Sequence, residues 1–66
     1  MGEYYTENLA DMLEMAAEKP GMALALAEHL ADCWDEEEDV EGNAAAAIEE
    51  RREAWHLIVE KLRNLQ

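Results

Sequence analysis

Residues 43–66 read NAAAAIEERREAWHLIVEKLRNLQ, and this stretch decides the fold. Apolar side chains recur in it at alternating spacings of four and three residues, which is typical of a helix that buries one face. We expect a long helix over residues 44–65, with Asn43 as its N-cap. After Ala44, the repeat that should form a core or dimer seam comprises Ile48, Arg51, Trp55, Ile58, Leu62 and Leu65.

Two more helices should precede this one. Five β-branched residues against twelve alanines favour helix over strand, and turn signals at residues 19–21 and 40–43 divide the chain. We expect a first helix over residues 7–18, with Thr6 as its N-cap, and a second from residue 21 to a point between 34 and 38. Their apolar faces comprise Tyr5, Leu9, Met12, Leu13 and Ala16 in the first, and Ala23, Leu26, Leu30, Cys33 and Trp34 in the second. The fold class is therefore all-α, a three-helix bundle with a short first and a long third helix, in a single domain over residues 1–66.

A second copy of the chain is expected to complete the core. The third helix should be about 33 Å long and the first about 18 Å, so part of the long seam would lack a partner. Leu24, Ala31 and Leu57 also have no evident partner within the chain. A lone Cys33 excludes an intrachain disulfide, which is one of the usual supplements to a small core. We therefore expect a symmetric homodimer.

The net charge lies entirely in residues 1–42, which hold thirteen acidic residues and one lysine, whereas residues 43–66 sum to zero. A net charge of −12 repels nucleic acid and anionic membranes and attracts basic protein surfaces. The acids repeat about every 5 Å along one face of each of the first two helices. The candidate partner-binding residues are Glu7, Asp11, Glu14, Glu18, Glu28, Asp32, Asp35, Glu36 and Asp39.

These acidic faces predict a small interaction protein, an inhibitor or regulator that binds the basic, nucleic-acid-binding surface of a partner protein. Its carboxylates would take the places of phosphates. Acidic proteins of phages and mobile elements, such as anti-restriction and anti-CRISPR proteins, act in this way, and the analogy rests on size and charge alone. The alternative is a structural homodimeric adaptor that docks an apolar groove, with the acids serving only solubility.

The sequence gives little support to catalysis or metal binding. It has no serine and no Gly-rich phosphate loop, so we expect neither an enzyme nor a cofactor. Residues 37–42 resemble the start of a calcium loop, but Ile48 stands where the bidentate Glu would be needed. His29 and Cys33 lie one turn apart, yet a structural zinc site needs four ligands. We expect no metal.

The remaining expectations concern single side chains and location. Arg51 should pair with a carboxylate or a carbonyl, or extend to the surface. Trp34 and Trp55 should lie in the core, and at least one of Tyr4 and Tyr5, placed before the first helix, should be exposed. We expect a cytoplasmic protein that contacts neither membrane nor nucleic acid directly. The chain starts without an apolar signal segment, has one unpaired cysteine and contains no apolar run of membrane length.

Overall fold

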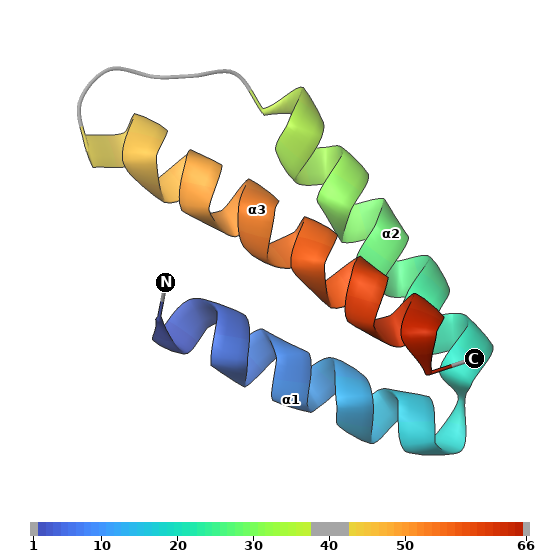
Figure 1. Cartoon of the computed structure of the whole chain (residues 1–66). Helices are drawn as coiled ribbons and strands as arrows, with labels where there is room; N and C mark the ends of the chain where they lie inside the picture. The colour runs from blue at the N-terminus through green and yellow to red at the C-terminus, as the bar shows by residue number, and fades with distance from the viewer. Residues whose placement is uncertain (1, 38–42, 66) are drawn as a thin grey trace.

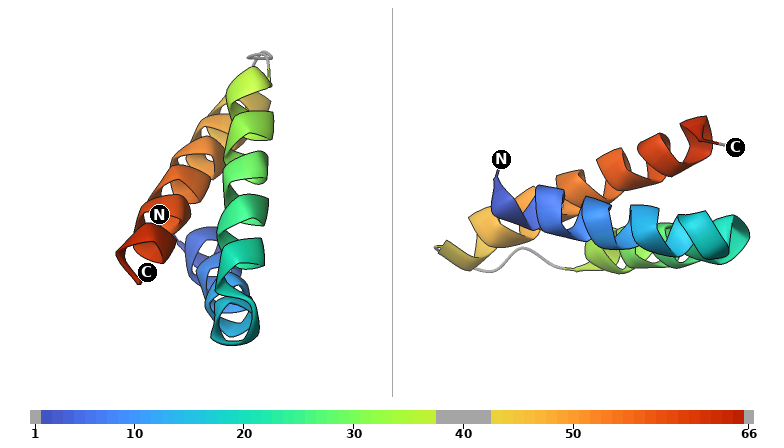
Figure 2. Two further views of the ribbon diagram at one scale, coloured as in Figure 1. Left: turned by 90° about the vertical axis from the view of Figure 1, so that its right-hand side faces the viewer. Right: turned by 90° about the horizontal axis from the view of Figure 1, so that it is seen from below.

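Three helices, connected in an up-down-up order, make up the fold. The computed structural model describes residues 2–37 and 43–65, in which α1 spans Glu3–Glu18, α2 spans Pro20–Glu36 and α3 spans Asn43–Asn64. α2 runs antiparallel to its two neighbours, and α3 crosses α1 at an angle (Figures 1 and 2). The predicted all-helical, three-helix architecture is confirmed, with α3 the longest helix. The side chain of Asn43, the expected N-cap, lies outside the described part of the chain.

A single residue joins α1 to α2. The backbone N–H of Lys19 donates to the carbonyl of Met15 at 2.7 Å, and the carbonyl of Lys19 accepts from the N–H of Ala23 at 3.0 Å. Lys19 thus closes one helix and opens the next. Pro20 is the first residue of α2, a position where its missing N–H would have no intrahelical partner in any case. This tight turn aligns the two helices as an antiparallel pair.

The start of α1 differs from the prediction. The helix begins at Glu3 with Gly2 as its N-cap, so the prediction that Thr6 caps it is wrong. Thr6 lies inside the helix, where its hydroxyl donates to the carbonyl of Gly2 at 3.4 Å. Tyr4 and Tyr5 are therefore helical, and both are half-buried against the core, so the prediction that at least one of them is exposed is wrong. Packing of these two rings favours the extra helical turn over the capping signal of Thr6.

The core is built on a row of alanines. Ala23, Ala27 and Ala31 recur every four residues on α2 and are 0%, 0% and 4% exposed. Small side chains at this spacing let the neighbouring helices approach α2 closely. The larger buried side chains come from the other two helices and are Met12 from α1 and Trp55, Ile58, Val59 and Leu62 from α3.

Several residues lie elsewhere than their spacing predicted. Ala31, expected to lack an intrachain partner, is buried, and Leu24 packs against the core. Cys33, expected on the apolar face of α2, is exposed. Leu65, the last residue of the expected seam, is 65% exposed.

The middle of the α3 seam is covered within one chain, because Trp55, Ile58 and Leu62 are buried there and Ile48 is half-buried. The homodimer stays a prediction. Within residues 2–37 and 43–65, none of the helices combines the length and the hydropathy that crossing a membrane requires.

Replacing Ala27 by leucine should destabilise the fold by about 1–3 kcal/mol, because the added carbons must enter a fully packed helix contact. Urea unfolding followed by circular dichroism measures the change. Ala25→Leu is the matched control, since Ala25 is exposed on the same helix and the substitution there should be nearly neutral. Equal stability of the two variants would contradict the packing role of the alanine row.

Candidate functional site

The carboxylates of α1 form an uninterrupted row on its solvent side. Glu7, Asp11, Glu14 and Glu18 are all exposed, and the longer helix adds Glu3, which the sequence reasoning missed because it started the helix too late. The α1 acidic row, defined here as these five residues, extends over about 22 Å. Among the described residues, none of the five forms an ion pair. The row is thus available to an external cation.

The acids of α2 are used differently. Asp35 and Glu28 form ion pairs with α3, so two of the predicted partner-binding residues already have partners within the chain. Asp32 and Glu36 are exposed. Asp39 lies outside the described residues. The structure therefore does not display the two helices as equivalent acidic faces.

Arg52 and His56 of α3 converge on the C-terminal end of α2. Arg52 donates from Nε to the carbonyl of Trp34 at 3.1 Å and from Nη2 to the carbonyl of Glu37 at 3.1 Å. Its Nε also lies 3.7 Å from Asp35 Oδ1. A cation at a helix C-terminus is favoured by the helix dipole and by the carbonyls that lack intrahelical donors. Arg52 therefore stabilises an end of α2 whose last turn holds no basic residue of its own.

His56 completes this contact. Its Nε2 lies 2.8 Å and 2.9 Å from the two carboxylate oxygens of Asp35. Because an ionised carboxylate only accepts hydrogen bonds, Nε2 carries the hydrogen.

A polar groove of about 790 Å³ follows the junction of α2 and α3, with Ala31 and Val59 among its lining residues. Arg63 of α3 lines this groove and donates to Glu28 Oε2 at 2.6 Å. Both side chains are largely exposed, at 63% and 43%, so this pair contributes little to stability.

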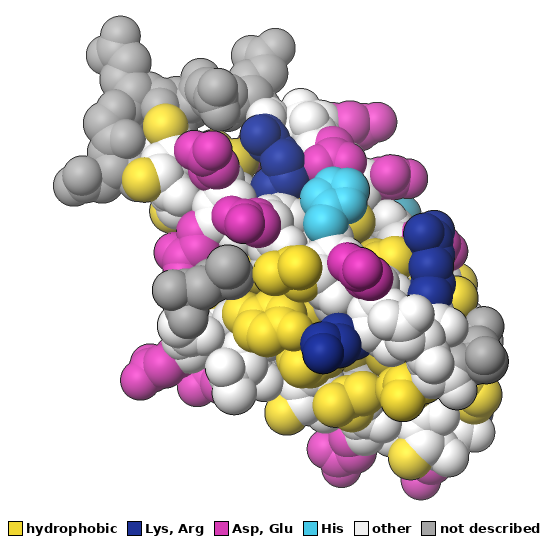
Figure 3. Space-filling view, in the orientation of Figure 1, with side chains coloured by type: hydrophobic (Ala, Val, Ile, Leu, Met, Phe, Trp, Pro, Cys, Tyr) yellow, Lys and Arg dark blue, Asp and Glu magenta, His cyan; other side chains and the backbone are white. Residues whose placement is uncertain are grey.

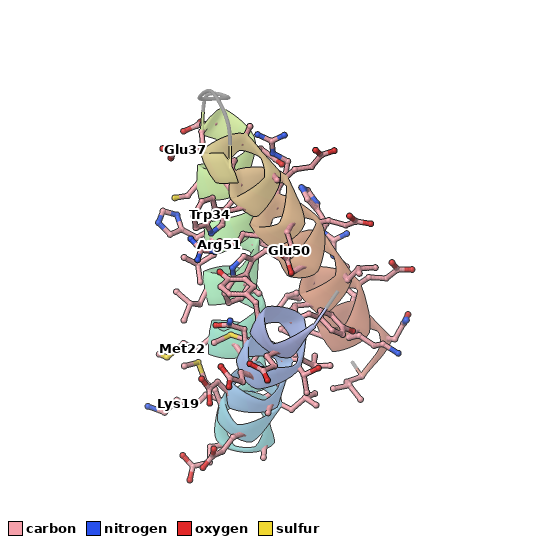
Figure 4. All side chains as sticks on the ribbon, turned by 90° about the vertical axis from the view of Figure 1, so that its left-hand side faces the viewer. Lys19, Met22, Trp34, Glu37, Glu50 and Arg51 are labelled. Carbon is pink, nitrogen blue, oxygen red and sulfur yellow. The ribbon has the colours of Figure 1, made fainter. Side chains whose placement is uncertain are left out.

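Arg51 is exposed and stacks on aromatic rings, and among the described residues it pairs with neither an acid nor a carbonyl. Its guanidinium carbon lies 5.1 Å from the ring centre of Tyr4 and 5.6 Å from that of Trp34, both within cation–π range. Figure 4 shows Arg51 beside Trp34. The Nε1–H of Trp55 donates to the hydroxyl of Tyr4 at 2.7 Å. These four side chains join all three helices near the N-terminus of α1.

The remaining metal candidate does not gather a ligand set. His29 Nε2 lies 3.7 Å from the sulfur of Cys33, as their spacing predicted, but the residues that the structure describes contain no group of three or more His, Cys, Asp or Glu placed to hold a metal ion. Most of the stretch that resembles a calcium loop, residues 37–42, lies outside the described residues.

A hydrophobic hollow of about 310 Å³ opens between α1, the start of α2 and the end of α3. All of its lining residues have apolar side chains, and we call the space that they enclose the hydrophobic hollow. They are Leu13, Ala16, Ala17, Pro20, Leu62 and Leu65. Helical spacing in the sequence did not predict this hollow, because its walls come from three different helices. In Figure 3 hydrophobic side chains follow the junction of α1 and α3, with Asp and Glu on both sides.

The chain matches no protein-family model, no curated protein and no solved structure. We therefore infer the function from the surface geometry of the described residues.

Substituting Arg52 by methionine, which keeps the aliphatic stem, should destabilise the protein by about 1–3 kcal/mol, because two carbonyls at the end of α2 lose their charged donor. Arg63→Met is the matched control and should cost under about 1 kcal/mol, since it breaks only an exposed ion pair. Urea unfolding curves give the change in the free energy of unfolding for both variants, from the shift in midpoint at an unchanged m-value. A larger loss for Arg63→Met would contradict the capping role of Arg52.

Proposed function

We propose that this protein is a small acidic interaction module that inhibits or regulates a partner by binding its basic, nucleic-acid-binding surface. The α1 acidic row is the contact surface, and its carboxylates occupy positions on the partner that phosphates otherwise fill. Asp32 and Glu36 of α2 add exposed charge, whereas Glu28 and Asp35 form ion pairs with α3.

The observation that carries this proposal is the difference between the two acidic helices. The acids of α1 are exposed and form no ion pair among the described residues, although α3 supplies three arginines that contact the other helices. Glu18 also lies in the last turn of α1, where a carboxylate costs about 0.3–1 kcal/mol at low salt, and the C-cap Lys19 next to it offsets part of that cost. A row of exposed acids without partners among the described residues favours a role in binding.

The spacing of the row limits what it can imitate. One carboxylate about every 5 Å is sparser than the one charge per roughly 1.7 Å of duplex DNA. The row therefore fits a short groove of lysines and arginines better than an extended nucleic-acid channel. A rigid helix holds the charges at fixed separations, so fewer degrees of freedom are lost on binding than with a disordered acidic tail.

The alternative, an adaptor that docks through an apolar surface, draws support from the hydrophobic hollow. In that case the acids would serve only to keep the protein dispersed. The two functions differ in their response to salt, because exposed charge interactions are screened beyond about 10 Å at 0.1 M salt and apolar contacts are not.

The test begins with affinity capture at low and high ionic strength, followed by mass spectrometry. A captured protein is then titrated with labelled DNA or RNA in the presence of the acidic protein. We expect competitive displacement of the nucleic acid, with an affinity that falls steeply as salt rises. Displacement that is non-competitive or independent of salt would contradict the proposal.

Replacing Glu7, Glu14 and Glu18 by glutamine and Asp11 by asparagine should weaken binding by about 10- to 100-fold at low salt, since each lost charge contact contributes about 0.5 kcal/mol or somewhat more. The matched control removes the same number of charges from α3, by Gln at Glu49, Glu50, Glu53 and Glu60, all exposed. Its binding should change far less. Equal losses would show that net charge alone acts and that α1 presents no specific surface.

A further inference from the structure

We propose that the hydrophobic hollow is a second part of the same docking surface and binds an apolar anchor side chain on a basic amphipathic helix of the partner. The inference rests on the proposed function, because it takes a basic partner as given. It adds that the partner presents leucine-like side chains beside its lysines and arginines.

The composition of the hollow supports an apolar anchor. All six lining residues are apolar, and its volume of about 310 Å³ lies at the small end of ligand pockets, which suits one or two side chains. Leu65 is 65% exposed and Leu13 is 39% exposed, so part of its wall stays in contact with water. Covering these surfaces is favourable in proportion to the apolar area removed from water.

The unpaired acidic row on the α1 wall of the hollow, together with the net charge of −12, favours a basic occupant. On α1, Glu14 follows Leu13 and Glu18 follows Ala17, so two members of the α1 acidic row are sequence neighbours of lining residues on the same helix. Three cations also adjoin lining residues in the sequence, because Lys19 precedes Pro20 and Lys61 and Arg63 lie on either side of Leu62. Of these, Arg63 is paired with Glu28 of α2. An amphipathic helix can lay its apolar face into such a hollow while its basic residues reach the acids alongside.

A second copy of this chain is a poorer occupant. It would bring another net charge of −12 against the first, and the acids that flank the hollow would face more acids. A basic helix instead meets complementary charge at the same place. The proposal therefore commits to a basic amphipathic partner.

The probes are two helical peptides of equal charge, one of lysine and leucine with leucines at helical i, i+3 and i+4 positions, and one with alanine in place of every leucine. Binding is measured by fluorescence anisotropy, and the leucine methyl signals of the protein are followed by NMR. We expect the leucine peptide to bind at least about tenfold more tightly than the alanine peptide. The methyl shifts should be largest at Leu13, Leu62 and Leu65.

Leu13→Ala and Leu65→Ala should each weaken binding of the leucine peptide about 3- to 10-fold and leave the alanine peptide unchanged. Both side chains are partly exposed, so truncation spares the core. Met22→Ala is the matched control, because Met22 is 55% exposed and is not part of the lining of the hollow (Figure 4). An equal effect of Met22→Ala, or no effect of either leucine variant, would overturn the proposal.

Lys61→Gln gives an independent readout, since it removes one of the cations that adjoin the lining residues and should tighten binding of the leucine peptide about two- to threefold. Weaker binding would argue against a basic occupant. Sedimentation velocity should give the same oligomeric state for the unmodified protein and for Leu65→Ala, because the proposal places no second copy in the hollow. A dimer that Leu65→Ala dissociates would identify a second copy as the occupant and overturn the inference.

The two proposals fail in distinguishable ways. If both peptides bind equally well and substitution of the α1 acidic row weakens both, the hollow is not a docking site and the proposed function stands. If substitution of that row leaves the alanine peptide unaffected, the proposed function itself is contradicted.

Discussion

The structure depends on how α3 meets two helices that both carry negative charge. Residues 3–36 hold nine acids and one lysine, so α1 and α2 repel each other as they pack. α3 has no net charge, but its charges are segregated. Arg51 stacks on Tyr4 and Trp34, and Arg52 and Arg63 contact α2, whereas its glutamates are exposed. The arginines thus offset repulsion at the helix contacts, and the acids remain outside.

Burial of apolar surface supplies most of the stabilising free energy, and the arginines set the position of α3 more than they stabilise it. Exposed ion pairs contribute about 0–1 kcal/mol each. Burial of a large apolar side chain contributes about 1.5–3 kcal/mol, and α3 alone buries Trp55, Ile58, Val59 and Leu62. Apolar burial is non-directional, whereas hydrogen bonds depend on geometry. The Arg52 contacts with the end of α2 and the hydrogen bond from Trp55 to Tyr4 therefore favour one orientation of α3.

This segregation connects the fold to the proposed function. Because the three arginines of α3 contact α2 and the aromatic stack, none of the acids in the α1 acidic row forms an ion pair among the described residues. The hydrophobic hollow lies beside that row, where the ends of α1 and α3 and the start of α2 meet. Charge supplies long-range attraction and a fast encounter, and an apolar anchor supplies short-range specificity. Both parts lie on rigid helices.

The sequence by itself determined the three helices, the turn at Lys19-Pro20, the burial of Trp55, Ile58 and Leu62, and the exposure of the acids on α1, because periodicity and turn chemistry are local properties. It could not identify the buried face of α2, because the alanines and the leucines of that helix both recur at helical spacing and either set could form the face. Nor could it show that Arg51 stacks on aromatic rings while Arg52 binds the end of α2. It also could not show that Glu28 and Asp35 form ion pairs while the acids of α1 do not. Only the tertiary structure decided these points, since each depends on which side chain of another helix lies opposite. The hydrophobic hollow has the same origin, because three distant segments form its walls.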